Sequence, residues 1–315
     1  MVDNTSEHLF NYSAFEAFFR GPRKEIKERL SIYLPLITLL PPLGILPALD
    51  IGCGRGEWLE LLKDNHINGT GIDSNAEFIE CCRELDLKAE EVDLFHFLSR
   101  AGDQKYNLIT GFHLIEHIAP EKQLWFLDSM FRLLMPGGMV ILETPNPENV
   151  TVGSCNFYID PTHLRPVPPH LLHVLALQAG FASPLIARVN RNTVGEPLRM
   201  MAGETPEAAL YNRLVDIISS RLLQAPDYAL IAFKPPAPTL AMLDAVSAIN
   251  QLNDLFLLPP AVSEIPDNIA IEKMERTEPS LNTIDIPAAT NVRSNRFSEY
   301  PESVLRTYLQ LLASR

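Results

Sequence analysis

Short apolar runs alternate with amphipathic, helix-length segments between Leu46 and Thr144, and this alternation narrows the possible folds most. The runs read ALDIG, GTGID, KAEEVD, YNLITGF and GGMVILET, and helices are expected to begin between them at Glu57, Ala76 and Pro120. Strands that alternate with helices along a chain form a parallel sheet with helices on its faces. The pattern therefore predicts a Rossmann-like, doubly wound α/β domain.

Two further strands are expected after this region. The helical segment PPHLLHVLALQAGF is followed by the runs SPLIARVN and DYALIAFKP, with a helical insertion from about Glu207 to Leu223 between them. Together the runs predict a seven-stranded, mostly parallel sheet in a domain that spans residues 41–235.

The segments on either side of this domain have a different character. Residues 1–40 are expected to form an N-terminal helical cap of two short helices, with Pro22 at a helix start. Residues 236–315 form a C-terminal tail, helical at about 240–256 and from about 301 and without clear periodicity between. Two interpretations of the tail stay open: a partly disordered segment whose terminal helix packs on its own domain, or a docking helix for a partner or a second copy.

Composition and charge argue against several classes of protein. The formal net charge of -13 disfavours a general nucleic-acid binder, whose affinity depends on Lys and Arg that neutralise phosphates. The sequence shows no signal peptide, and prolines interrupt LSIYLPLITLLPPLGILPALDI, the stretch that comes closest to a membrane span. The cysteines show no CxxC spacing, which favours reduced thiols in the cytoplasm over disulfides or a zinc site.

The stretch LDIGCGRGEWLELL places Gly52, Gly54 and Gly56 between the first strand and a helix. Open α/β sheets bind ligands at this edge, and the missing Cβ atoms let a ligand approach the backbone closely. The glycine spacing alone allows a dinucleotide or a sulfonium cofactor. Glu57 occupies the third glycine position of a dinucleotide-binding GxGxxG loop, where a carboxylate would repel a pyrophosphate.

With Asp50 in front, the loop resembles the DxGxGxG motif of class I S-adenosylmethionine-dependent methyltransferases, in which the acidic residue supports the methionine ammonium group of the cofactor. The resemblance implies that Asp73, with Ser74 beside it, accepts hydrogen bonds from the ribose hydroxyls. It also implies that Asp93 and the Leu94 amide contact the adenine. MPGGMVILETP resembles the turn and the fifth strand of the same family.

A cation is expected to hold the carboxylate of the cofactor. Arg29, 21 residues before Asp50, is favoured over Arg20 and Arg23. Trp58 is expected in the core rather than in the cofactor site. The remaining expected cofactor contacts are Tyr12, which would contribute to a lid, Phe112 and His113.

Residues from about 12 to 234 are similar to one bacterial group within this superfamily. The shared motifs read FRG, GCGRGEWLELL, FHLIEH, LETPNPEN, GSCNFYIDPTHLRP and DYALIAFKP. The group resembles the methyltransferase portion of O-antigen chain-terminating enzymes, which act on the non-reducing end of a lipopolysaccharide glycan. The resemblance implies methylation of a sugar hydroxyl or a sugar-bound phosphate at the cytoplasmic face of the inner membrane. No HRD and DFG kinase motifs follow the domain, which weakens the phosphate version.

Two loops at the carboxyl edge of the predicted sheet carry groups that suit hydroxyl activation. GFHLIEH follows the fourth strand and DPTHLRP follows the fifth, and the candidate catalytic residues are His113, Glu116, His117, Asp160, His163 and Arg165. A sugar hydroxyl is a poor nucleophile near neutral pH, so a general base or a metal is expected. If residues 113–117 form a helical turn, His113 faces Glu116 and His117.

Three interpretations of these loops stay open. In the first, one histidine is the base, with His117 and His163 favoured. In the second, His113, Glu116, His117 and His163 bind a divalent metal such as Mg²⁺, because the motif resembles the metal-binding ExxEH of small-RNA 2′-O-methyltransferases. In the third, the loops have structural roles only.

Acceptor contacts are expected from the loop after the fifth strand. Arg165, Asn146 and Asn156 would hold hydroxyls or an acidic substituent, and Tyr158 or Phe157 would stack on a sugar face. Two other functions stay open: methylation of a small molecule or a quinone-like phenol, and non-catalytic cofactor binding within a glycan-synthesis complex. The expected partners are a glycan or glycolipid acceptor and, through the tail, a glycosyltransferase, a second copy or the membrane surface, but no nucleic acid.

Overall fold

The computed structural model describes residues 11–37, 40, 47–190 and 200–236, and every structural statement here concerns these residues. The chain divides into two units, residues 1–262 and 263–315, and the second lies wholly outside the described residues. Beyond residue 236, the predicted tail with its two helical segments also lies outside them.

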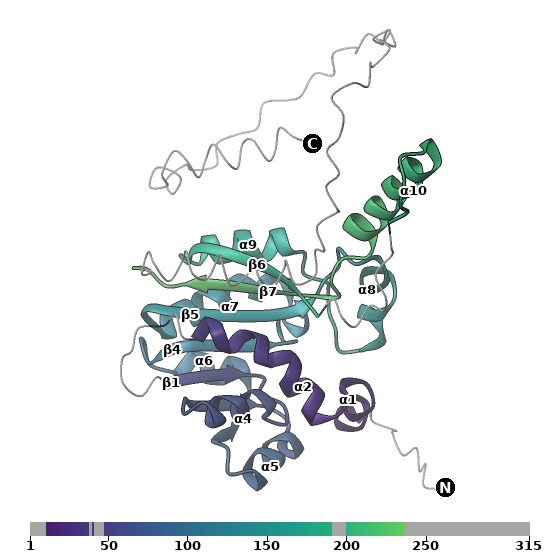
Figure 1. The fold of residues 1–315 in the computed structure, drawn as a ribbon. Coiled ribbons are helices and arrows are strands. Elements are labelled where there is room, and N and C mark those ends of the chain that lie inside the picture. The colour runs from purple at the N-terminus through teal and green to yellow at the C-terminus, as the bar shows by residue number, and fades with distance from the viewer. Residues whose placement is uncertain (1–10, 38–39, 41–46, 191–199, 237–315) are drawn as a thin grey trace, which may run out of the picture. The chain divides into compact units, whose positions relative to one another are not determined.

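The predicted alternation forms a single sheet of seven strands in the order β3-β2-β1-β4-β5-β7-β6 (Figure 1). Strands β1 to β5 run parallel to one another, and β7 is antiparallel to both of its neighbours, β5 and β6. This confirms the predicted seven-stranded, mostly parallel sheet. The strands are β1 (Pro47–Ile51), β2 (Asn68–Asp73), β3 (Ala89–Glu91), β4 (Tyr106–Phe112), β5 (Leu134–Pro145), β6 (Ala182–Val189) and β7 (Asp227–Phe233).

Helices cover both faces of the sheet, as expected for central strands that are apolar on both sides. In β5, Val140 and Leu142 belong to one hydrophobic cluster, whereas Met139 and Ile141 belong to the other. The first cluster includes residues of α6 (Leu94–Arg100), α7 (Pro120–Leu133) and α9 (Pro169–Gln178), and the second includes residues of α2 (Arg23–Leu30), α3 (Leu34–Ile37) and α4 (Glu57–Asp64). Trp58 is buried in the second cluster, as predicted.

The N-terminal cap follows its expected design, with one more short helix than predicted. α1 (Tyr12–Arg20) is capped by the Asn11 side chain, and Pro22 is the N-cap of α2. A 3-10 turn (Ser31–Tyr33) leads from α2 into α3, and Ile26 and Leu30 of α2 pack on the sheet. The cap is therefore part of the domain core rather than a separate layer.

The loops that carry the predicted site meet at the carboxyl edge of the parallel strands. The 3-10 turn η2 (Ile115–His117) follows β4, and α8 (Val150–Ser154) with the turn η3 (Asn156–Ile159) follows β5. β7 runs the opposite way, so its first residue, Asp227, lies at the same edge, paired with Pro145 of β5. α5 (Ala76–Glu84) follows β2, and α10 (Pro206–Ile217) with a π-helical turn (Ile218–Leu222) forms the predicted insertion before β7. No described helix is long and apolar enough to cross a membrane.

Candidate functional site

A cavity of about 730 Å³ lies at this edge, between α1 and the loops after β1, β2, β4 and β5. It brings together most of the residues that the sequence suggested. The predicted residues that line it are Tyr12, Arg29, Gly52, Gly54, Asp73, Ser74, Asp93, Leu94, Phe112, His113, His117, Asn156, Asp160 and His163. Asp50, Gly56, Glu116 and Arg165 are predicted site residues that are not among its lining residues.

The glycine loop presents bare backbone to this cavity at Gly54. Its φ is +51°, and a Cβ atom there would lie 2.9 Å from Nη1 of Arg20, so a side chain at this position would be strained and crowded. Gly56 is bare for another reason: a Cβ there would lie 2.7 Å from the Sγ of Cys82, beneath the loop. Close packing of α5 against the loop and a left-handed φ of +82° therefore both require glycine at position 56.

Asp50 lies behind the glycine loop and is almost fully buried. Its Oδ1 accepts a hydrogen bond of 2.7 Å from the Thr110 hydroxyl. Burial raises the pKa of Asp50 to about 7, although Thr110 and the charge of Arg20 partly oppose the shift. The Asp50 side chain is thus anchored to Thr110 of β4, and it does not line the cavity itself.

Two further carboxylates mark the ends of β2 and β3. Asp73 accepts a 2.9 Å hydrogen bond from the Gly54 amide and a 2.8 Å bond from the Asn75 amide, one on each oxygen. Asp93 caps α6 by accepting from the His96 amide at 2.8 Å. Both side chains are held rigidly by backbone donors and keep lone pairs free for a ligand.

Two arginines of the cap line the cavity. Arg20 lies over Gly54 and forms an ion pair with Glu16, and Arg29 donates to the Arg20 carbonyl at 3.4 Å. Arg23 does not line the cavity; it bonds to Glu60 at 2.7 Å. The sequence favoured Arg29 as the cation for the carboxylate of the cofactor. In the structure both arginines line the cavity, and Arg20 is the one that lies against the glycine loop.

Glu57, whose carboxylate disfavours a dinucleotide at the glycine loop, is surrounded by arginines. The Glu57 side chain is fully buried, with Arg55 at 2.8 Å and with Arg20 and Arg23 each at 3.8 Å. These pairs tie α1 and α2 to the start of α4.

His117 is held in one orientation by Thr162. Its Nδ1 lies 3.3 Å from the Thr162 carbonyl oxygen, which can only accept, and 3.0 Å from the Thr162 hydroxyl oxygen. That hydroxyl donates to Asp160 at 2.6 Å, so its oxygen accepts from His117. The proton therefore sits on Nδ1, and Nε2 keeps a lone pair that is not hydrogen-bonded to any described residue.

The electrostatic surroundings keep His117 neutral. Burial lowers the pKa of His117, and the nearby His163 adds to this, although Glu116 and Asp160 partly oppose it. A neutral imidazole with a free Nε2 in a cavity is a competent general base.

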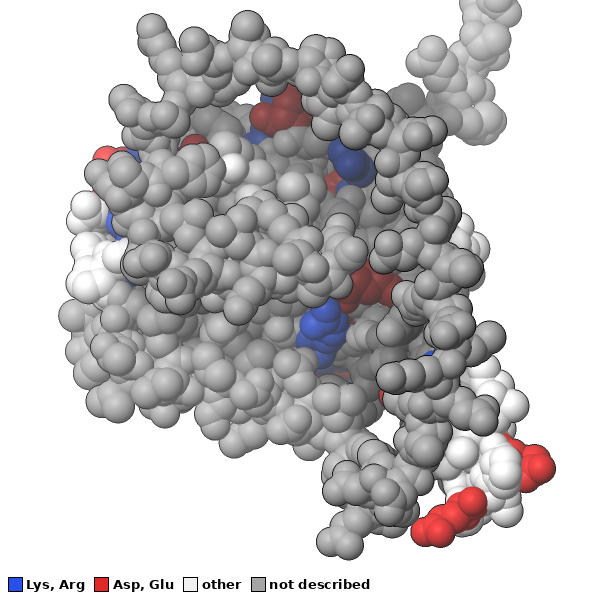
Figure 2. Space-filling model, turned by 90° about the horizontal axis from the view of Figure 1, so that it is seen from above, with Lys and Arg blue, Asp and Glu red and all other residues white. Residues whose placement is uncertain are grey.

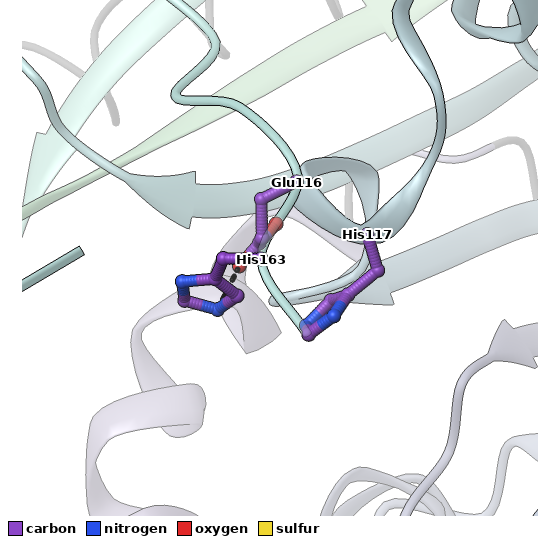
Figure 3. A group of neighbouring side chains, drawn as sticks. All are labelled: Glu116, His117 and His163. Carbon is purple, nitrogen blue, oxygen red and sulfur yellow. Dashed lines mark ion pairs between the residues drawn. The ribbon is translucent and has the colours of Figure 1, made fainter. Parts of the chain in front are cut away.

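Glu116 and His163 lie beside His117, as Figure 3 shows. Glu116 is fully buried; its Oε2 accepts from the Thr144 hydroxyl at 2.8 Å, and its Oε1 has no hydrogen-bond partner. His163 bonds to the Phe157 carbonyl through Nδ1 at 2.7 Å, and its Nε2 is 3.9 Å from Glu116 Oε1. The three side chains offer ligand atoms within 4.8 Å of one another, a spacing that a divalent cation could bridge.

His113 belongs to a different group, so the predicted four-residue metal set is split. Its φ of +54° and the 3-10 form of η2 turn its ring toward Glu143 and Asp227, at 3.3 Å and 3.8 Å, although Glu116 also lies 3.4 Å away. Burial opposes the charged imidazole, but these carboxylates outweigh it and hold the pKa of His113 well above its usual value.

Glu143, Asp227 and Tyr33 complete this second group, and sequence reasoning did not assign them. Glu143 accepts from the Tyr33 hydroxyl and lines the cavity, and Asn190 donates to both Glu143 and Asp227. Burial raises the pKa of Asp227 to about 6, while His113 lowers it. The one signal in the sequence that could have pointed to this group is Glu143, an acidic residue inside the apolar run VILET.

Four residues that were expected to contact the acceptor do not line the cavity. Asn146 is fully buried and donates to the Ala225 carbonyl, and Phe157 is a core residue against His163. Tyr158 and Arg165 are exposed and outside the cavity lining. A 2.9 Å bond from the Leu164 amide to the Glu116 carbonyl fixes the loop so that His163 faces inward, and only Asn156 of the expected set lines the cavity.

The cavity is acidic. Its lining includes five carboxylates, Glu16, Asp73, Asp93, Glu143 and Asp160, against Arg20, Arg29 and the His113 imidazole, whose pKa is raised. On the face shown in Figure 2, the described Lys and Arg side chains that can be seen lie in separate places, several of them next to Asp or Glu. This charge favours neutral or cationic ligands over additional anions.

Comparisons with known proteins agree with this geometry. A family model described as a methyltransferase domain matches residues 18–183. The crystal structure of a SAM-dependent methyltransferase from Archaeoglobus fulgidus matches with a TM-score of 0.62 and 30% identity, over 71% of this chain and 100% of that chain.

Two curated relatives match over shorter regions. A protein of Mycolicibacterium smegmatis described as a probable S-adenosylmethionine-dependent methyltransferase is 29% identical over 136 residues, 42% of this chain and 51% of that protein. A mitochondrial ubiquinone biosynthesis O-methyltransferase of Dictyostelium discoideum is 28% identical over 141 residues, 39% of this chain and 43% of that protein. The chain therefore spans about half the length of the curated relatives it matches.

Proposed function

Because the chain belongs to the methyltransferase-domain family of S-adenosylmethionine-dependent enzymes, we propose that it methylates a neutral sugar hydroxyl of a bacterial polysaccharide or O-antigen. The observation that carries an O-methyl transfer is the neutral His117, fixed by Thr162 with Nε2 free in the cavity that the glycine loop borders. The O-antigen class rests on the motif resemblance, and chain termination is its further implication.

The residues around the glycine loop fit the cofactor. Backbone at Gly54 is bare where a Cβ would collide with Arg20, and Asp73 and Asp93 offer fixed acceptors for ribose hydroxyls and an adenine amine. Arg20 and Arg29 supply the positive charge for its carboxylate. The bound cofactor supplies an electrophilic methyl group on a positively charged sulfur.

The chain's own residues then serve the acceptor. The acceptor oxygen forms the new O–CH₃ bond as the S–CH₃ bond breaks, and its proton passes to Nε2 of His117. Thr162 and Asp160 hold the Nδ1 proton and stabilise the imidazolium that results, as an orienting group does for a catalytic histidine. Proton and charge balance, because the product of the cofactor is a neutral thioether.

The acidic lining favours a hydroxyl over a phosphate acceptor. A sugar phosphate would bring more negative charge to a cavity whose five carboxylates outnumber its three cationic groups, Arg20, Arg29 and His113. A neutral sugar has no such penalty. A phenol is the main rival acceptor, since ubiquinone biosynthesis O-methyltransferases are among the relatives.

A metal-assisted mechanism is the second candidate, because Glu116, His117 and His163 offer ligand atoms within 4.8 Å of one another, although Glu116 Oε1 also pairs with His113 Nδ1 at 3.4 Å. In that version a divalent ion held by these three residues would lower the pKa of the acceptor hydroxyl. Unchanged turnover after exhaustive EDTA treatment, with no gain on adding Mg²⁺ or Mn²⁺, would rule it out.

The decisive experiment incubates the full-length protein with labelled cofactor and three acceptor panels: neutral oligosaccharides, sugar phosphates and phenols. We expect transfer to an oligosaccharide hydroxyl. Methyl transfer only to phenols would contradict the glycan proposal. Cofactor binding without any turnover would instead favour a non-catalytic role for the protein within a glycan-synthesis complex. The proposal also places the protein in the cytoplasm at the inner face of the inner membrane, with the tail from residue 236 contacting a glycosyltransferase, a second copy or the membrane surface.

A further inference from the structure

A row of aromatic rings leads from the candidate base to the protein surface along α1. The ring centroids of His117 and Tyr12 are 6.4 Å apart, those of Tyr12 and Phe15 6.2 Å, and those of Phe15 and Phe19 4.7 Å. Phe18 continues the row 4.9 Å beyond Phe19. Helical spacing places Tyr12, Phe15 and Phe19 on one face of α1, and all three line the cavity.

Burial decreases along this row. Tyr12 and Phe15 are partly buried, Phe19 is 55% exposed and Phe18 is 81% exposed. Core packing does not account for Phe19, which lines the cavity and is more than half exposed, or for the more exposed Phe18 beside it. An apolar patch that continues out of a binding cavity is typical of a ligand-binding surface.

The polar groups around the row indicate the chemistry of the ligand. Asn156 and Asp160 line the same cavity as Tyr12, Phe15 and Phe19, and Ile159 on η3, which also lines it, is 44% exposed. A sugar ring has an apolar face of C–H groups, which packs on an aromatic ring, and an edge of hydroxyls, which bond to amide and carboxylate groups. A lipid chain would leave the polar groups unpaired, and an anionic glycan would meet Glu16 and Asp160.

The size of the cavity limits what it can enclose. Its 730 Å³ lies within the range of about 300–1,000 Å³ that is typical of small-molecule sites. The cofactor and one sugar ring would occupy that space, so the rest of a longer acceptor must lie outside, where Phe19 and Phe18 are exposed.

We infer that Phe15, Phe19 and Phe18 form an acceptor subsite that binds the sugar rings next to the one that is methylated. The inference rests on the proposed function and makes it more specific: the acceptor is an uncharged oligosaccharide or polymer end rather than a free monosaccharide. Recognition of several rings would make methylation efficient only on a chain.

The test compares neutral gluco-, manno- and galacto-oligosaccharides of one and four residues with the full-length protein. For the wild type, kcat/KM is expected to be higher for the preferred tetrasaccharide than for its monosaccharide. Phe19→Ala and Phe18→Ala should each reduce this tetrasaccharide-to-monosaccharide ratio about tenfold, and Phe19→Trp should restore it, because the stacking surface returns.

The matched control is Leu210→Ala, which removes a 62% exposed apolar side chain of α10 that does not line the cavity. It should leave the ratio unchanged. The Kd for S-adenosylhomocysteine, measured by calorimetry for each variant, reports whether the cap still folds over the cofactor site.

Three outcomes would overturn the inference. If the wild type methylates carbohydrate but Phe19→Ala and Phe18→Ala keep the full ratio, the subsite is wrong and the proposed function stands. If no oligosaccharide is methylated or bound in the presence of S-adenosylhomocysteine while a phenol is methylated, the glycan function fails together with the subsite. If the wild type co-sediments with phosphatidylcholine vesicles and Phe18→Ala does not, the rings contact a bilayer instead.

Discussion

The Thr162 hydroxyl oxygen lies 3.0 Å from Nδ1 of His117, and this contact joins the two loops that carry the candidate catalytic residues. His117 follows β4 and Thr162 follows β5, 45 residues later. Because the same hydroxyl donates to Asp160, the imidazole is held in a single tautomer. The orientation of His117, the proposed base, therefore depends on contacts between separate loops.

Replacing His117 with Ala should lower kcat about 10²- to 10⁴-fold, the usual contribution of a general base. Cofactor affinity should change little, since the described contacts of His117 are with Thr162, Tyr12 and His163 rather than with the glycine loop. The rate and the Kd for S-adenosylhomocysteine check the two halves of this prediction. His170→Ala, which removes an exposed histidine of α9, is the control and should keep full activity.

The activity should depend on pH through His117. A base works in its neutral form, and burial lowers the pKa of His117, so kcat/KM should be at its plateau at pH 7. It should fall as pH drops, with a midpoint below the ordinary histidine value of about 6.5. A midpoint above 7 would assign the base to another group.

Thr162→Val should lower kcat about tenfold, because the hydroxyl that orients His117 is lost while the side-chain shape is kept. Thr162→Ser retains the hydroxyl and should recover most of the rate. Equal rates for both variants would show that the carbonyl contact of residue 162 alone holds the ring.

Asp227→Asn should stabilise the protein at neutral and alkaline pH. Burial raises the pKa of Asp227 to about 6 in the folded protein, whereas in the unfolded chain it is about 4. Below pH 4 the carboxyl is protonated in both states and costs the folded protein nothing, and as the pH rises through 6 the folded protein loses stability because the buried group must ionise. The substitution removes this cost, on the order of 1–3 kcal/mol, and an amide oxygen can still accept from Asn190.

Thermal unfolding of wild type and Asp227→Asn between pH 4 and pH 8 measures this effect. The difference in Tm should be largest at pH 8 and should vanish near pH 4. Glu84→Gln changes an exposed carboxylate and should show no such pH dependence. A variant less stable than wild type at pH 8 would mean that the ion pair with His113 outweighs burial.

Arg20→Met should weaken cofactor binding tenfold or more, because a charge-assisted contact to the carboxylate is lost. Arg23→Met is a matched control: each guanidinium is 3.8 Å from Glu57, but only Arg20 lines the cavity. Calorimetric Kd values for the cofactor, measured for both variants, show whether only Arg20→Met weakens binding. Similar losses in both variants would point to the shared pairing with Glu57 rather than to ligand contact.

The order of the elements and the glycine loop were accessible from the sequence. Local periodicity predicts each strand and helix, since it depends on which face of a short segment is apolar. The LDIGCGRG stretch indicated the cofactor edge, and Asp73 and Asp93 could be placed by counting strand ends. The helix α6 and the exact path of the cap were not apparent, because short segments carry weak periodicity.

The tertiary structure alone decided how the acidic and histidine side chains are grouped. Glu143 and Asp227 are 84 residues apart in the sequence numbering and meet only because β7 runs antiparallel beside β5. That pairing draws His113 away from His117 and His163 and divides the expected metal set. Arg165, Asn146 and Phe157 were misplaced for a related reason: a loop's sequence gives its residue types, while contacts with distant strands fix which side chains face the cavity. The sequence by itself thus determined the fold and the cofactor edge, which follow from local patterns, whereas long-range packing decided the orientation and tautomer of His117 and the grouping of charges that line the cavity.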